Sequence, residues 1–249
     1  MGLNERVSIC LCFVGHGYEL ILLKLMRMLK NLGYKPHILD HTKEHTIYYS
    51  VTHIDGIDPE RQELDVVDAF YRISVPGQEG SEENLLDIKD VSEKTCIIEL
   101  YDYEGMPKEK SLKVNDQTSI GATTDTSTKC KHACGMIRKM TVIVTDEHRW
   151  HLEALKSLRE KPEGSILVLK DYSGAAAKSI DEITLSLNPE MVYALPFSDK
   201  DHKISILSEN TRKRSTGSIS TELRKILYEL IKRILPDIDD KALKRAGKT

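Results

Sequence analysis

The pattern of apolar and polar positions at the start of the chain predicts a strand, a loop and a helix. Residues 7–14 form an apolar run, as expected for a strand that is buried on both faces. Residues 19–32 carry apolar side chains at helical spacing and end at Gly33, where a helix C-cap commonly lies. A second strand is predicted at 35–39, so these segments form a β-α-β unit with parallel strands.

Predicted strands and helices alternate again in the second half of the chain. Apolar runs predict three strands, at 140–145, 165–169 and 191–195. Helical spacing predicts one helix between each pair of strands, at 147–159 and 180–187. The segment from 140 onward is therefore expected to fold as β-α-β-α-β.

A long amphipathic helix is predicted near the C-terminus, over residues 218–235. Its apolar side chains share one face, Ser218 or Ser220 can serve as the N-cap, and Pro236 stops the helix. This face is expected to pack on the sheet, with binding to a membrane surface as the alternative. The charged residues 237–249 are expected to form a flexible tail.

The middle of the chain gives weaker signals. Residues 70–75 and 95–101 are strand candidates, whereas 51–67 and 76–92 are polar with little periodicity. Residues 108–129 are rich in polar side chains and are predicted to be a mobile loop or an interaction segment.

Strands that alternate with helices predict an α/β fold: a doubly wound, mostly parallel sheet with helices on both faces. At 249 residues the chain can bury one sizeable core, so we expect a single P-loop-like domain over residues 1–236. In such a fold, ligands bind at the carboxyl ends of the strands.

Composition narrows the classes of function. Lys and Arg total 36 against 39 Asp and Glu, and this balance gives no global field that would attract nucleic acid. No apolar run is long enough for a membrane span or a signal sequence, which predicts a cytoplasmic protein without direct membrane insertion. The odd number of cysteines, five, favours a reducing compartment. Cys130, His132 and Cys134 could share one helical face, but a fourth metal ligand is not evident, so no metal is predicted.

The first predicted strand leads into the loop Gly15-His16-Gly17. A P-loop binds phosphate through glycine amides, a Lys that reaches the phosphates and a Ser or Thr that completes the Mg²⁺ shell. Tyr18 and Glu19 stand at the places of the Lys and the Ser or Thr. We therefore predict no tight triphosphate binding and no cofactor, with weak binding of ATP and Mg²⁺ as the alternative. A turn with two glycines is also common in any doubly wound protein.

The order of segments resembles the MinD/ParA-like family of deviant Walker A ATPases. Aligned with the loop of that family, Gly15 and Gly17 match two glycines, whereas Phe13 and Tyr18 replace its two lysines and Glu19 replaces its Mg²⁺-binding Thr. The resemblance therefore implies a degenerate member of the family that does not hydrolyse ATP.

Two acidic residues of the family pattern are retained. Asp40 ends the second predicted strand, and Asp102 follows the strand candidate at 95–101, where the family has a Mg²⁺-side acid. Lys170 and Asp171 occupy the place of the family's base-contacting Asn, and no Asn is there. The strand ending at Asp146 and the helix after it resemble the segment that leads into the dimer-facing helix of these proteins.

The resemblance implies a pseudo-ATPase: a scaffold or positioning factor for a membrane-associated bacterial assembly of the secretion or pilus type. Protein partners, a homodimer and recruitment to the inner face of the membrane would follow from it. One alternative is a weak ATP-binding protein or slow ATPase that uses Asp40, Asp102 and the loop amides, with His16 on a phosphate. Another is an unrelated doubly wound, nucleotide-dependent enzyme in which Asp40 binds a ribose hydroxyl.

Overall fold

The computed structural model describes residues 8–43, 47, 63–66, 69–73, 94–104, 137–158, 162, 164–210 and 218–248. The strands are β1 (Ser8–Gly15), β2 (Tyr34–Asp40), β3 (Glu63–Val66), β4 (Ala69–Ile73), β5 (Lys94–Tyr101), β6 (Ile137–Thr145), β7 (Ile166–Lys170) and β8 (Met191–Leu195). The helices are α1 (Glu19–Asn31), α3 (Arg149–Lys156), α4 (Ala177–Leu187), α5 (Asp199–Asn210), α6 (Thr221–Ile234) and α7 (Asp240–Ala246).

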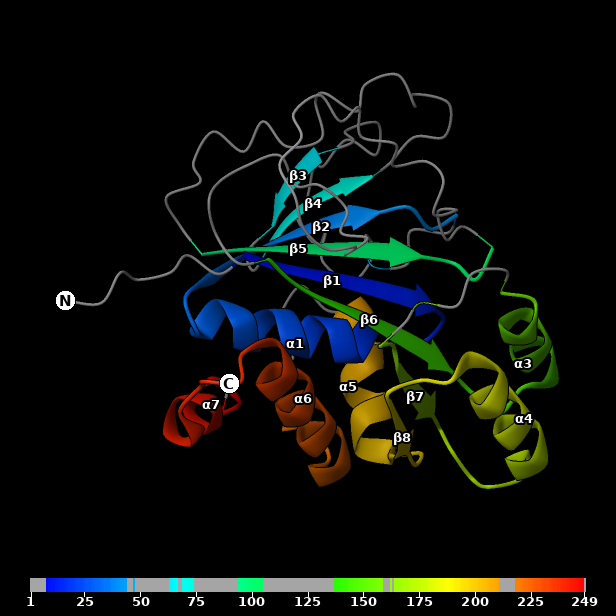
Figure 1. Ribbon diagram of the computed structural model, residues 1–249. Helices are drawn as coiled ribbons and strands as arrows, with labels where there is room; N and C mark the ends of the chain where they lie inside the picture. The colour runs from blue at the N-terminus through cyan, green and yellow to red at the C-terminus, as the bar shows by residue number, and fades with distance from the viewer. Residues whose placement is uncertain are drawn as a thin grey trace, which may run out of the picture.

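The strands form one eight-stranded sheet in the order β3-β4-β2-β5-β1-β6-β7-β8 (Figure 1). Every described pair of neighbours is parallel except β3 and β4, which are antiparallel. The chain builds β2 and β5 on one side of β1 and then crosses to β6 on the other side. The carboxyl end of β1 is thus the point where the strand order reverses, which is the usual ligand position in an open α/β sheet.

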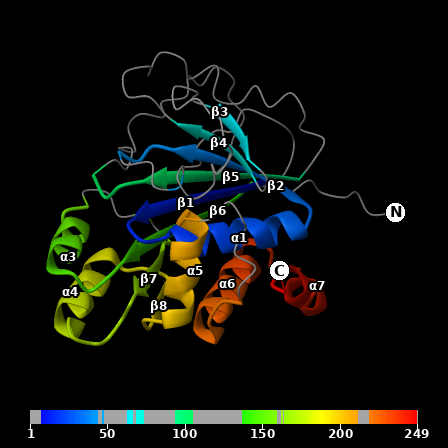
Figure 2. The same ribbon diagram turned by 180° about the vertical axis from the view of Figure 1, so that it is seen from behind.

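Helices cover both faces of the sheet, as predicted for a doubly wound α/β fold. Ile9, Leu11 and Phe13 of β1 belong to the core that contains the buried faces of α1, α6 and α7. Val14 belongs to the second core, under α3 and α4. Two opposite views show α3 beside α4, and α6 and α7 grouped with α1 (Figures 1 and 2).

The sequence predicted several boundaries correctly. Strand β8 has the expected limits, and α1 begins at the expected Glu19. Ser220 is the N-cap of α6, because its hydroxyl accepts a hydrogen bond from the Leu223 amide at 3.1 Å. The apolar face of α6 packs on the sheet, with Leu223, Leu227 and Leu230 fully buried.

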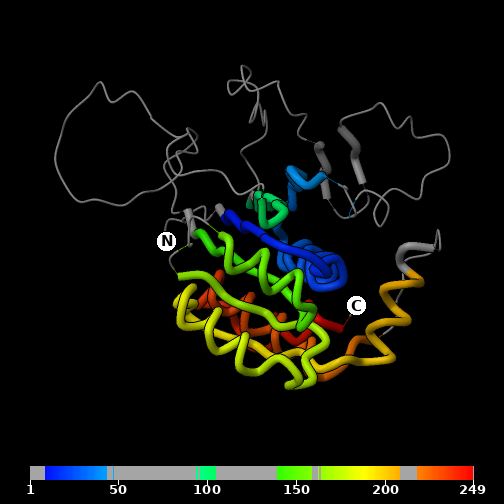
Figure 3. Tube along the Cα trace, turned by 90° about the vertical axis from the view of Figure 1, so that its right-hand side faces the viewer, coloured from blue at the N-terminus to red at the C-terminus, as the bar shows by residue number. Residues whose placement is uncertain are grey.

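The predicted flexible tail is wrong for residues 240–246, which form helix α7. Its side chains Leu243 and Ala246 are buried, and Asn31 Nδ2 of α1 donates a hydrogen bond to the Ala246 carbonyl at 3.1 Å. The C-terminal segment accordingly lies beside α1 (Figure 3). The sequence pattern missed this docking because so short a helix has room for only two buried positions.

Two further elements were not predicted, the edge strand β3 and the helix α5. The segments at 51–62, 76–92 and 108–129 and the residues Cys130, His132 and Cys134 lie outside the described residues. In the part of the chain that the structure describes, no helix combines the length and the apolar character that crossing a membrane requires.

Candidate functional site

The loop that joins β1 to α1 lies at the point where the strand order reverses. Gly15 has a φ of +114°, and a Cβ on it would lie only 2.1 Å from the Val144 carbonyl oxygen of β6. The His16 amide donates to the same oxygen at 3.4 Å. Gly15 is therefore required by the close approach of β6, and the His16 amide is turned toward the sheet.

Gly17 brings the loop against a lysine from a different strand. Its φ is +73°, and Lys170 Nζ lies 3.1 Å from the place where a Gly17 Cβ would be. Lys170 ends β7, and its Nζ is 3.9 Å from Asp171 Oδ2. A cation therefore reaches the loop from β7, although the position after Gly17 holds none.

Tyr18 occupies the N-cap position of α1, but its side chain makes no capping hydrogen bond. The residue is only 2% exposed, and its ring centroid is 5.8 Å from that of Phe13 in the core. Burial raises the pKa of the Tyr18 hydroxyl far above its usual value, and the negative charges of Asp40, Glu19 and Asp102 raise it further. The side chain at the start of α1 is thus the neutral phenol of Tyr18, and the charges that act on it are negative.

The two acids of the predicted site, Asp40 and Asp102, lie at the carboxyl ends of neighbouring strands. Asp40 is fully buried, and its Oδ1 accepts hydrogen bonds from the Thr42 amide at 2.9 Å and the Thr42 hydroxyl at 2.6 Å. Asp102 Oδ2 accepts from the Lys43 amide at 2.8 Å. These carboxylates therefore anchor the turn after β2, and the buried Asp40 is not open to a ribose hydroxyl.

The side chain of His16 joins a cluster of aromatic rings. Its ring stacks on that of His151 with centroids 5.0 Å apart, and the rings of Tyr103 and Trp150 lie at 5.2 and 6.0 Å. His151 Nδ1 is 2.6 Å from Asp146 Oδ1, while the Tyr103 hydroxyl donates to the Val144 carbonyl at 2.8 Å. This arrangement fixes His16 against α3 and leaves Trp150 64% exposed at the edge of the cluster.

All six predicted site residues are described. Gly15, His16, Gly17 and Tyr18 form one loop, and the field of Asp40 and Asp102 reaches Tyr18. Sequence reasoning missed the approach of Lys170 to Gly17 and the His151–Asp146 pair beside His16. Their places in the sequence could have indicated both contacts. Asp146 follows β6 and Lys170 ends β7, so both lie at the carboxyl ends of parallel strands, as the loop does.

No protein-family model matches this chain, and no curated protein is significantly similar to it. Within the described ranges, no cluster of three or more His, Cys, Asp or Glu side chains could hold a metal ion. Fold and loop together define the chain as a doubly wound α/β protein with a glycine turn at its topological switch point.

Proposed function

We propose that this chain is a degenerate P-loop-like protein that does not hydrolyse ATP and serves as a scaffold or positioning factor. The observation that carries the proposal is Tyr18, a buried phenol at the position where a phosphate-binding loop needs a cation. The resemblance to MinD/ParA-like proteins supplies the class of assembly, a membrane-associated bacterial machine of the secretion or pilus type.

The electrostatics at the start of α1 oppose a triphosphate. A hydrogen bond to a charged group contributes about 1.5–3 kcal/mol, so exchanging the lysine for a phenol removes that much from phosphate binding. Glu19, Asp40 and Asp102 all act on Tyr18, and their negative charge would add repulsion toward a phosphate placed there. The Tyr18 side chain is buried in the core with its ring centroid 5.8 Å from that of Phe13, so it offers no group to a phosphate at the loop.

Lys170 favours a second candidate, weak nucleotide binding. Its ammonium group lies against Gly17, where it could contact a phosphate held by the loop amides. Asp171 lies 3.9 Å from that ammonium group and partly offsets its charge. Under this second candidate, removing Lys170 would abolish nucleotide binding, whereas under the first candidate there is no such binding to lose.

A homodimer through α3 is part of the proposal. The helix follows the strand and Asp146, which resemble the segment that leads into the dimer-facing helix of the family. Its Trp150 is 64% exposed and packs against His151 and His16, so the loop and a partner surface are adjacent. Exposed tryptophans in fixed positions are typical centres of protein interfaces.

The degenerate loop is tested by restoring the missing residues. The double substitution Tyr18→Lys, Glu19→Thr adds the cation and the hydroxyl and removes one carboxylate. We expect its affinity for ATP–Mg²⁺, measured by calorimetry on the whole chain, to exceed that of the wild type at least about tenfold. The partly exposed Glu19→Thr substitution alone is expected to give a smaller gain of about threefold from reduced repulsion.

An unchanged affinity in the folded double variant would show that the loop is not a decayed P-loop. Circular dichroism checks the fold, because Tyr18 is part of the core. If the double variant does not fold, an unchanged affinity in Glu19→Thr contradicts the proposal in the same way.

A further inference from the structure

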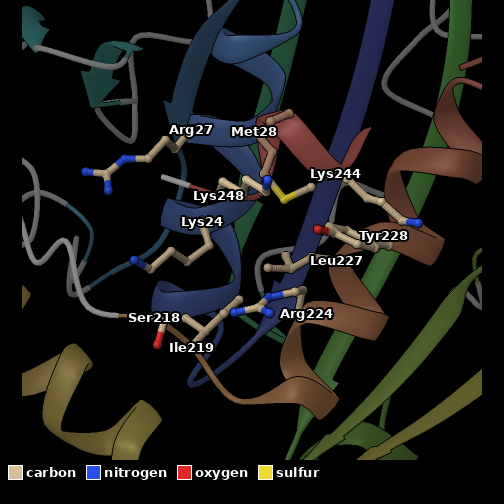
Figure 4. A pocket seen from close by; sticks show the side chains of 12 residues that line it. Lys24, Arg27, Met28, Ser218, Ile219, Arg224, Leu227, Tyr228, Lys244 and Lys248 are labelled. Atoms are coloured by element: carbon tan, nitrogen blue, oxygen red, sulfur yellow. The ribbon is translucent and has the colours of Figure 1, made fainter. Parts of the chain in front are cut away.

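A basic pocket lies between α1, α6 and α7, on the face formed by these helices. Its volume is about 300 Å³, which falls at the lower end of the range for small-molecule sites. The cationic side chains that line it are Lys24, Arg27, Arg224, Lys244 and Lys248, and no carboxylate is among its described lining residues. Figure 4 shows Lys24 and Arg27 on α1, Arg224 on α6, and Lys244 and Lys248 at the C-terminal end.

The pocket contains a charged donor without a partner. The Nε–H group of Arg224 is buried and donates a hydrogen bond to no described oxygen or nitrogen. Arginine is always charged in proteins, and a buried donor without a partner lowers the stability of the fold. In Figure 4, Arg224 extends from α6 toward α1, the helix that carries Lys24. An anion between these helices would satisfy the donor.

Lys24, on α1, is a second cation at the pocket, and its side chain is partly buried. Burial lowers its pKa from 10.5 to about 8, and the neighbouring Arg27 lowers it further, while Asp201 acts in the opposite direction. Asp201 itself accepts a hydrogen bond from the Ser220 amide at 2.7 Å through Oδ1. A bound anion would offset the repulsion between the cations and the loss of hydration around Lys24.

The floor of the pocket is apolar. Met28, Leu227 and Tyr228 lie between the cationic side chains, and Leu227 is fully buried in the core. Gly247 allows the chain after α7 to approach the ring of Tyr228, since a Cβ there would lie 2.7 Å from it. A pocket with a cationic rim and an apolar floor suits a phosphate group that is attached to an organic body.

We propose that the pocket between α1, α6 and α7 binds a phosphate-bearing ligand, with Arg224, Lys24 and Lys248 as its contacts. The site is separate from the β1–α1 loop, and its occupancy does not depend on the scaffold role proposed above. Two sources share the chemistry: a small phosphorylated metabolite and the phosphorylated headgroup of a lipid.

The test titrates the whole chain with inorganic pyrophosphate by calorimetry, without Mg²⁺. We expect one site with a dissociation constant below about 1 mM, and at least about tenfold weaker binding in Arg224→Ala. Lys225→Ala is the matched control, because Lys225 is the next cation on α6, is exposed and does not line the pocket. Lys248→Ala, at an exposed position, is expected to weaken binding about threefold without disturbing the fold.

Absence of pyrophosphate binding would overturn the proposal, as would an equal loss in Arg224→Ala and Lys225→Ala. If Arg224→Ala fails to fold, unchanged binding in Lys248→Ala overturns it. Flotation with phosphatidylcholine vesicles, with and without phosphatidylinositol 4-phosphate, distinguishes the two sources. Vesicle binding that requires the phosphoinositide and is displaced by pyrophosphate supports a lipid headgroup, and pyrophosphate binding without vesicle binding supports a soluble ligand.

Discussion

At the β1–α1 loop, the residue at the start of α1 is a buried tyrosine, and the acids that act on it are Glu19, Asp40 and Asp102. The loop glycines were recognisable from sequence, because a turn between a buried strand and a helix calls for them. The sequence also placed Asp40 and Asp102 at strand ends. The hydrogen bonds from Thr42 to Asp40 are a local turn between residues two apart, whereas the bond from the Lys43 amide to Asp102 depends on how β2 and β5 align, which no local pattern encodes.

Lys24 provides a prediction on stability and pH. Its pKa is about 8 in the folded protein and near 10.4 in an unfolded chain, so the unfolded state binds more protons between these values. The cost of burying the charge is therefore complete below pH 8 and is relieved as the pH rises toward 10.4. Lys24→Met should stabilise the protein at pH 7 by about 1 kcal/mol after allowance for solvent screening, and the gain should disappear near pH 10.4.

Urea unfolding at the two pH values measures this effect. The exposed Lys30→Met on the same helix serves as the control and should show no comparable dependence on pH. A loss of stability in Lys24→Met at pH 7, or a gain that does not change with pH, would contradict the lowered pKa of Lys24. The variant should also bind pyrophosphate more weakly, a trade of function for stability.

Among the helices and strands, apolar periodicity identified the elements that bury a continuous stripe or run of apolar side chains. Strands β1 and β7 and helices α1 and α6 follow this rule, whereas β8 has only Leu195 buried and was recognised from its apolar run alone. Helix α5 was missed because Ile204 is buried whereas Ile206 and Leu207 are about half exposed, so its apolar residues do not mark one face. Strand β3 is four residues long at an edge of the sheet, and α7 has only two buried residues.

Helix α3 is the element through which we expect the homodimer to form. We expect Trp150→Ala to weaken the homodimer by about 2 kcal/mol or more, since an exposed tryptophan beside a rigid cluster is a typical interface centre. Sedimentation equilibrium of the wild type and the variant measures the change. Leu185→Ala on α4 is the control, because Leu185 is 84% exposed and lies on another helix. A monomeric wild type, or equal dimerisation of wild type and Trp150→Ala, would exclude this interface.

The whole molecule presents two regions of opposite electrostatic character. At the carboxyl edge of the sheet, carboxylates surround the start of α1, and Tyr18 is buried in the core there. Between α1, α6 and α7, cations gather around an apolar floor without a carboxylate among the described lining residues. The order of elements predicted the first region, whereas the second arises from three helices distant in sequence and could not be predicted from any one of them.

A crystal structure of the wild-type chain soaked with ATP and Mg²⁺ would show whether the β1–α1 loop holds a nucleotide. We expect no triphosphate at Gly15–Tyr18 and a Tyr18 ring that remains in the core against Phe13. A triphosphate held by the loop amides and Lys170, with Mg²⁺ coordinated near Asp40 and Asp102, would contradict this expectation.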